Sequence, residues 1–297
     1  MGQRYCGRFA PSPTGPLHLG SLVAAIASYL EAKRHGGSWL VRMEDLDPAR
    51  EVFGASAHIL QTLEAFGFQW DRPVLYQSKR VDAYTSALVT LHNLKQTYPC
   101  RCTRKQLAQS APRGPGGGSI YPGTCRYEAH VPPPCVIRVK VGSQHIAFDD
   151  KFQGHYQQQL NTEVGDFIVR RRDQLCAYQL AVVIDDAAQG ITDVVRGSDL
   201  LSSTPRQIHL QRLLRLTQPK YAHIPVIINT IGHKLSKQTH ASALNTATPL
   251  PELLLAASYL GQNPPNHLKT VTTFWSWAMQ YWNPQHIPKQ ISIPEVP

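Results

Sequence analysis

The chain has 297 residues, 42% of them hydrophobic, and 30 lysines and arginines against 20 aspartates and glutamates give it a formal net charge of +10. This length is enough to bury a core and to form one to three domains, and the positive balance favours a polyanionic partner. No apolar run reaches about 18 residues and the N-terminus lacks the apolar segment of a signal peptide, so we expect no membrane contact and a cytoplasmic location.

The first motif is a loop that leads from a short strand into a helix. Residues 4–9 are compatible with a strand, and apolar side chains recur at helical spacing over 22–35. A helix N-terminus presents unpaired backbone N–H groups and favours an anion. Gly20 permits a ligand to approach the backbone, and His18 can donate to a phosphate oxygen. The alternative is a proline-rich connection with a surface histidine.

A second strand is expected over 39–44, ending in a polar turn. A carboxylate at the carboxyl end of such a strand faces the ligand crevice of an open α/β sheet, so Glu44 is a candidate ligand for an ammonium group. A surface acidic turn is the alternative. Amphipathic periodicity predicts a helix over 56–66. A further helix is expected over 81–96.

Three of the six cysteines lie close together in the sequence and suggest a metal site. Cys100 and Cys102 can bind one ion from a tight turn, and Cys125 is the natural third ligand. A structural zinc ion takes four ligands, and the residues alone leave the fourth open, with His130 as one choice. Three free cysteines in a loop remain the alternative.

The middle of the chain predicts further strands. Residues 135–141 alternate as a strand does, and a hairpin is expected near 148–154. The near-continuous apolar run 177–186, which ends in two acids, predicts a strand buried on both faces. Beyond it, Arg196 is either a bidentate carboxylate clamp or a surface arginine.

A second basic motif follows a helix expected over 207–216 and a strand expected over 226–229. Lys234 and Lys237 flank two residues on a glycine-led loop and can hold a polyphosphate as point charges. A basic surface loop is the alternative.

In the C-terminal tail, helices are expected near 251–259 and 268–281. The aromatic side chains of this tail are more typical of a core than of a surface on which bases stack. The last fifteen residues contain four prolines and are expected to be irregular.

Over 7–244 these motifs resemble those of the class I glutamyl- and glutaminyl-tRNA synthetases. His18-Leu19-Gly20-Ser21 stands where the class has H-I-G-H, so Ser21 replaces the second histidine. The segment 42–47 is similar to R-I-E-D-T-D, and 234–238 is similar to the K-M-S-K-S loop in its K-L-S-K form. Two nucleotide motifs in the order of the class support each other.

The resemblance implies roles for individual residues. Those expected to bind glutamate are Arg8, Phe9, Ala10, Pro11, Ser12, Glu44, Tyr178 and Arg196. Those expected to bind ATP are His18, Gly20 and Lys237, and those expected to act catalytically are His18, Lys234 and Lys237. No nucleophilic side chain is needed, because adenylate formation relies on positioning and on charge stabilisation. Which arginine takes which glutamate carboxylate stays open.

One short branch of this family, which modifies queuosine, fits best. Ser198 and Leu200 depart from the R-G-E-D-H-L typical of enzymes that charge tRNA ends, and R-G-S-D-L-L is closer to the queuosine branch. The C-x-C…Y-x-x-x-C pattern of shortened members implies Tyr121 as the fourth zinc ligand, beside Cys100, Cys102 and Cys125.

The implied fold is α/β, with a class I synthetase Rossmann-type parallel sheet, an inserted zinc-binding α+β subdomain and a short helical C-terminal region. Only 60 residues follow Lys237, so no anticodon-binding domain is expected. The expected bounds are 1–98 and 176–240 for the two halves of the catalytic domain, 99–175 for the zinc and acceptor-binding-like subdomain, and 241–297 for a helical stem-contact-like region.

The implied activity is that of an ATP-dependent ligase. Glutamate attacks the α-phosphate of ATP, which carries Mg²⁺, and forms glutamyl-AMP without tRNA. The glutamyl group then passes to the cyclopentenediol of queuosine in the anticodon wobble position of tRNA(Asp). One structural zinc ion, contact with the anticodon stem-loop and a monomeric state complete this expectation.

Three other functions are compatible with the residues. A minimal glutamyl-tRNA synthetase would charge the tRNA 3′ end, and a non-catalytic paralogue would only bind tRNA. Another nucleotidyltransferase of the same fold is the third. The non-catalytic alternative is disfavoured by the presence of His18, Lys234 and Lys237, because a protein that only binds tRNA does not require these catalytic side chains.

Overall fold

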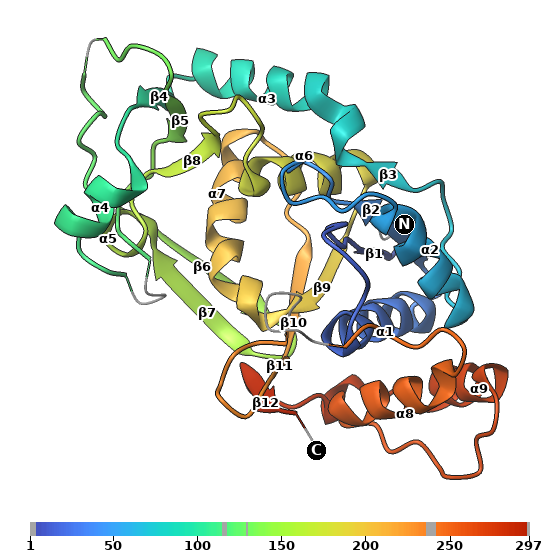
Figure 1. Ribbon diagram of the computed structural model, residues 1–297. Coiled ribbons are helices and arrows are strands. Elements are labelled where there is room, and N and C mark those ends of the chain that lie inside the picture. The colour runs from blue at the N-terminus through green and yellow to red at the C-terminus, as the bar shows by residue number, and fades with distance from the viewer. Residues whose placement is uncertain (1–3, 115–117, 129, 236–241, 296–297) are drawn as a thin grey trace.

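The computed structural model of the protein describes residues 4–114, 118–128, 130–235 and 242–295 (Figure 1). Its centre is built from short parallel strands: β1 (Cys6–Phe9), β2 (Ser38–Met43), β3 (Leu75–Tyr76), β9 (Asp193–Gly197) and β10 (Lys220–Ile224). β2 pairs with β1 and with β3, and β9 pairs with β10. The two groups meet where the backbone N–H of Thr192 donates to the carbonyl oxygen of Cys6 at 2.9 Å.

Helices surround these strands: α1 (Leu19–Arg34), α2 (Ala55–Ala65), α3 (Val81–Asn93), α6 (Tyr178–Gln189), α7 (Thr204–Leu213), α8 (Pro249–Tyr259) and α9 (Val271–Tyr281). α1 lies between the strands β1 and β9 and the C-terminal helices α8 and α9 (Figure 1). The small and apolar side chains of Ala25, Ile26 and Ala27 are fully buried, which lets α1 be covered from both sides. No helix in the described part of the chain has the length and apolar character needed to cross a bilayer.

An antiparallel unit interrupts the parallel strands. It consists of a sheet in the order β4 (Thr97–Cys100), β5 (Val136–Val139), β8 (Phe167–Arg170), a hairpin of β6 (His145–Asp150) and β7 (Gly154–Gln159), and the short helices α4 (Arg104–Ser110) and α5 (Leu160–Glu163). β6 also packs against β10 and α7, so the hairpin braces the second half of the parallel core. The 3₁₀ turns are η1 (Gln77–Arg80), η2 (Ser198–Ser203) and η4 (Pro284–His286).

The prediction of a buried strand over 177–186 is wrong, because this segment forms helix α6. An apolar run by itself does not distinguish a buried strand from a buried helix segment. Here the helix extends to Gln189 and ends at Gly190, whose φ of 69° is the left-handed conformation of a helix C-cap. The consequence is that Tyr178 stands in the first turn of a helix, and Asp185 and Asp186 are buried near its end.

The expectation of an irregular tail is also wrong in part. β12 (Ser292–Pro294) pairs in parallel with β11 (Val226–Ile228), and Ile293 packs against the core. Three residues give no periodic signal of their own, so the partner strand determines their conformation. A third difference is β10 at Lys220–Ile224, for which the sequence analysis predicted no strand. The expected core role of the tail aromatics holds for Phe274, Trp275 and Trp282, whereas Tyr281 is exposed.

Candidate active site and candidate metal site

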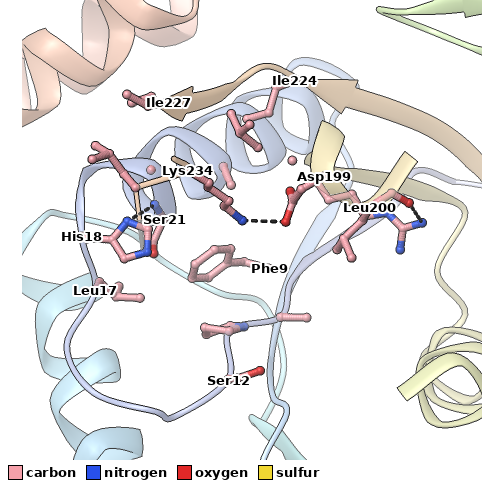
Figure 2. Close-up of a pocket in the computed structure, with 18 of the residues that line it drawn as sticks. Phe9, Ser12, Leu17, His18, Ser21, Asp199, Leu200, Ile224, Ile227 and Lys234 are labelled. Carbon is pink, nitrogen blue, oxygen red and sulfur yellow. Dashed lines mark hydrogen bonds and ion pairs between the residues drawn. The ribbon is translucent and has the colours of Figure 1, made fainter. Parts of the chain in front are cut away.

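A cavity of about 390 Å³ opens at the carboxyl ends of β1, β2, β9 and β10 (Figure 2). This is the edge at which ligands bind in open α/β sheets. Its lining brings together residues that the sequence predicted as a site: Arg8, Phe9, Ala10, Pro11, Ser12, His18, Gly20, Glu44, Tyr178, Arg196 and Lys234. Lys237, predicted to bind ATP and to act catalytically, lies outside the described residues.

The start of α1 forms one wall of the cavity. His18 is the N-cap, and its ring Nδ1 accepts a hydrogen bond from the backbone N–H of Ser21 at 3.4 Å. This contact favours the tautomer with its proton on Nε2, which is then a donor for a phosphate oxygen. A Cβ on Gly20 would lie 3.2 Å from the ring of His18, so any larger residue at this position would crowd the ring.

Lys234 reaches the cavity from the segment after β11. Its Nζ lies 2.6 Å from Oδ2 of Asp199, a residue at the start of η2, and Figure 2 shows the two side chains turned toward each other. A Cβ on Gly197 would lie 2.5 Å from Oδ1 of Asp199, so the glycine makes room for this carboxylate. Asp199 lines the cavity although no feature of the sequence marked it as a site residue.

Two arginines and two carboxylates form a buried network at the floor of the site. Asp186 accepts hydrogen bonds from Arg8 Nε at 3.1 Å and from Arg42 Nη1 at 2.7 Å. Burial opposes its ionisation, but Arg8 and Arg42 hold the pKa of Asp186 below its usual range. The two positive charges of the network balance its two negative charges. Buried charges are tolerated in a protein interior when they are paired in this way.

Glu44 is the weakly held member of that network. Among the described residues its carboxylate makes one ion pair, to Arg42 Nη2 at 3.5 Å. Burial raises the pKa of Glu44, while Arg42 and Arg8 oppose the rise. A cation that entered the cavity beside Glu44 would therefore gain a carboxylate that the protein itself satisfies only in part.

Arg196 is held by two neighbouring side chains and keeps one guanidinium nitrogen for a ligand. Its Nε donates to Nε2 of His223 at 3.0 Å and its Nη2 donates to Oγ1 of Thr204 at 2.8 Å. Nη1 is buried and has no hydrogen-bond partner among the described residues. An unpaired buried donor is costly, so its position beside a cavity indicates that a ligand oxygen completes it.

The three clustered cysteines meet in the antiparallel unit. The Sγ atoms of Cys100, Cys102 and Cys125 all lie within 4.8 Å of one another, and those of Cys102 and Cys125 are 3.7 Å apart. Thiolates on a tetrahedral zinc ion are separated by about 3.8 Å, given Zn–S bonds of about 2.3 Å. The hydroxyl oxygen of Tyr121 lies 3.3 Å from Sγ of Cys100 and 3.9 Å from Sγ of Cys102. This donor set fits a metal ion.

Arg138 and His130 bear on the same cluster. Arg138 Nε donates to Sγ of Cys100 at 3.2 Å, and its guanidinium lies 3.7 Å from the centre of the Tyr121 ring. Burial raises the pKa of the Cys100 thiol, but the hydrogen bonds with the Tyr121 hydroxyl and with Arg138 outweigh this and hold the pKa below its usual value. His130, the alternative fourth ligand, is exposed and is not part of the cluster. The geometry therefore supports Tyr121 over His130.

The residues that sequence reasoning missed are the partners of those it found: Arg42, Asp150, Asp186, Asp199 and His223. Apart from Arg42, which lies two residues before Glu44, they lie far along the chain from the side chains they contact, as Asp186 does from Arg8, so no local pattern connects them. The one available signal was the pair of acids that ends the apolar run, because buried acids require partners.

Comparisons with known proteins agree with this fold and site. The family model of the class I tRNA synthetases (E and Q), catalytic domain, matches residues 6–249. A glutamate tRNA ligase from Elizabethkingia meningosepticum, solved with its amino acid, superposes with a TM-score of 0.79 at 25% identity, over 98% of this chain and 67% of that one. The glutamate-tRNA synthetase of Elizabethkingia anophelis gives 0.79 at 26% identity, over 99% and 68%. The fold and the site thus define a class I synthetase core of the glutamate and glutamine type.

Relatives of the same length narrow this class. The glutamyl-Q tRNA(Asp) synthetase of Dechloromonas aromatica is 52% identical over 297 residues, which cover 99% of both chains. The protein of that name from Pseudomonas fluorescens is 52% identical over 98% of this chain and 96% of its own. The chain therefore belongs to the family of the glutamyl-Q tRNA(Asp) synthetases. The predicted fold class and family resemblance are confirmed.

Proposed function

We propose that this protein activates L-glutamate with ATP, without tRNA, and transfers the glutamyl group to the cyclopentenediol of queuosine in the wobble position of tRNA(Asp). The observation that carries the proposal is that one cavity contains two kinds of group. His18 and Lys234 can donate hydrogen bonds to phosphate oxygens, and Glu44 and Arg196 can bind the charged groups of an amino acid. Identity of about half over the full chain to proteins named for this activity supports it.

The amino-acid site has the charges that glutamate requires. Glu44, held among the described residues by one long ion pair, receives the ammonium group. Arg196 offers its unpaired Nη1 to a carboxylate, whereas Arg8 is already paired with Asp186. Tyr178 closes the site from α6. We assign Arg196 as the principal carboxylate ligand and Arg8 as the residue whose charge keeps the neighbouring acids ionised.

The nucleotide site works by positioning and charge. The N-terminus of α1, the Nε2 proton of His18 and the ammonium of Lys234 face the place where an α-phosphate meets the glutamate carboxylate. In the in-line displacement, the carboxylate oxygen forms the new bond to the α-phosphorus and pyrophosphate leaves. The protein stabilises the charge that develops on the phosphate oxygens. Lys237 is proposed to share this role, and Mg²⁺ arrives with ATP.

The remaining expectations become part of the same proposal. Cys100, Cys102, Tyr121 and Cys125 would hold one zinc ion, which would cross-link the antiparallel unit and play no part in the chemistry. The antiparallel unit corresponds to the proposed insertion 99–175, between catalytic halves 1–98 and 176–240 and before the helical region 241–297. A monomeric, cytoplasmic protein that binds the anticodon stem-loop of tRNA(Asp) completes the proposal.

The test uses labelled glutamate, ATP and two forms of tRNA(Asp), one with queuosine and one with unmodified guanine. We expect label only on the queuosine form, in the anticodon loop, removed by mild alkali. Prior oxidation with periodate, which destroys vicinal diols, abolishes it. Equal label on both forms at the 3′ end would instead make the protein a minimal tRNA-charging enzyme. Absence of both labelling and ATP–pyrophosphate exchange would leave only a binding role.

A further inference from the structure

The contacts of Arg196 continue into a chain of buried groups that lies behind the cavity. Nε of Arg196 donates to Nε2 of His223, and the other ring nitrogen of His223, Nδ1, lies 2.5 Å from Oδ2 of Asp150. The side chains of His223 and Asp150 are fully buried, and neither residue lines the cavity. They therefore stand behind the cavity wall and meet the site through Arg196, with Oγ1 of Thr204 also 3.3 Å from Nε2 of His223.

The hydrogen bonds determine which nitrogen of His223 carries the proton. Arg196 Nε–H is always a donor, so Nε2 of His223 must accept. The ring proton then lies on Nδ1 and is donated to the carboxylate of Asp150. Burial and the positive charge of Arg196 agree with this neutral ring, because they lower the pKa of His223 to about 4 although Asp150 opposes the shift.

Asp150 is itself held in one orientation. Its Oδ1 accepts the backbone N–H groups of Phe152, Gln153 and His223, at 3.0, 2.9 and 3.0 Å. Its Oδ2 is left to face His223. Since Asp150 ends β6 and His223 lies in β10, the pair also connects the β6–β7 hairpin to the strand below the site.

We propose that Asp150 and His223 are positioning residues for the amino-acid substrate: they lock one histidine tautomer, which fixes the guanidinium plane of Arg196 so that its free Nη1 meets a carboxylate of glutamate. This inference rests on the proposed function and adds two residues to it. With the ring proton on Nε2, two donors would face each other at 3.0 Å and the guanidinium would have to turn away.

The decisive variant is Asp150→Asn. The three backbone donors retain the remaining oxygen, so the amide nitrogen faces Nδ1 of His223 and donates to it. The ring proton must then move to Nε2, opposite Arg196. A wrong tautomer enforced by an amide in this way is known to impair a site whose geometry is otherwise intact. We expect KM for glutamate in ATP–pyrophosphate exchange to rise about tenfold or more, with KM for ATP unchanged.

Two further variants separate positioning from general damage. His223→Leu removes the acceptor for Arg196, whereas His223→Gln supplies an amide oxygen in its place, so glutamine should recover part of the glutamate affinity that leucine loses. Asp185→Asn is the matched control. Asp185 is a fully buried acid that accepts from Gln77, Arg80 and Tyr84 and does not line the cavity. It should lower the melting temperature and leave KM for glutamate unchanged.

The tautomer is also measured directly in the wild-type protein, by long-range ¹H–¹⁵N correlation of the imidazole signals with His223→Gln used for assignment. A proton on Nδ1 is expected, and a proton on Nε2 would overturn the inference even if Asp150→Asn does not fold. An unchanged KM for glutamate in folded Asp150→Asn would overturn it as well. Absence of glutamate-dependent exchange in the wild type would instead reject the proposed function, and the inference with it.

Discussion

The cavity and the cysteine cluster are both buried polar centres, but they are built in opposite ways. The cluster takes its sulfur atoms from 26 consecutive residues, Cys100 to Cys125, whereas the cavity joins residues from Arg8 to Leu235. At the floor of the cavity the charges balance, with Arg8 and Arg42 against Glu44 and Asp186. The cluster places three thiols and a phenol beside one cation, Arg138.

This difference predicts different dependence on ligands. A network whose charges already cancel keeps its shape without substrate, so the cavity is preorganised and its residues affect rate and affinity. The cysteines would bind a metal ion as thiolates, whose negative charges Arg138 alone does not balance, and a divalent cation supplies the missing charge. The cluster should therefore affect stability. Variants at each centre test whether the two effects are separate.

The largest expected effect is that of Arg196→Lys. Lysine keeps the charge but has no planar fork, so it cannot hold His223 and Thr204 and still offer a donor to glutamate. We expect kcat/KM for glutamate in ATP–pyrophosphate exchange to fall by about 10² or more. The exposed Arg50→Lys is the control and should change nothing. A loss smaller than about threefold at Arg196 would remove this residue from the amino-acid site.

The next effect is that of Lys234→Ala on the nucleotide half of the cavity. Removal of one preorganised charge costs about 10²-fold in rate, so kcat of the exchange reaction should fall by that factor. Its ion-pair partner gives a matched comparison, because Asp199→Asn leaves Lys234 in place. We expect Asp199→Asn to stay within about threefold of wild type. Equal losses in both variants would show that the ion pair, and not the lysine charge, matters.

At the cysteine cluster, Cys102→Ser should lower stability and leave catalysis nearly intact. We expect one zinc ion per chain in the wild type, clearly less in the variant, and a melting temperature lower by about 5 °C or more. Cys135→Ser is the control, since Cys135 is buried in the same hydrophobic cluster but lies outside the metal group. It should retain the metal. A loss of glutamate activation equal to that of Arg196→Lys would contradict the separation of the two centres.

The two regions also differ in how far the sequence predicted them. The cysteine group and the loop before α1 follow from spacing, because ligands or glycines a few residues apart are forced together. The family resemblance supplied Tyr178 and Arg196, but no pattern linked Arg8 to Asp186 or Arg196 to His223 and Asp150, since such ion pairs join segments by tertiary packing alone. The error at 177–186 has the same origin, because burial on all sides removes the periodicity that identifies a helix.

The smallest effect concerns the pH dependence of stability and depends on the groups behind the cavity. The folded protein holds the pKa of His223 at about 4, below its ordinary value of 6.5, because the ring is buried and faces Arg196. Between these two values the unfolded chain binds the proton and the folded protein does not, so His223 lowers the free energy of unfolding as pH falls from about 6.5 toward 4. The lowered pKa values of Asp150 and Asp186 act below this window.

Urea unfolding at pH 7 and pH 5.5 measures this contribution. We expect His223 to account for a loss of about 1 kcal/mol over that interval. Other titrating groups contribute to the total, so the quantity that tests the assignment is the difference between the wild type and His223→Gln, which cannot bind the proton. The variant should be less stable at pH 7 and should lose less stability on acidification. Parallel pH profiles for the two proteins would mean that His223 is already protonated in the fold, which is incompatible with a ring that accepts from Arg196.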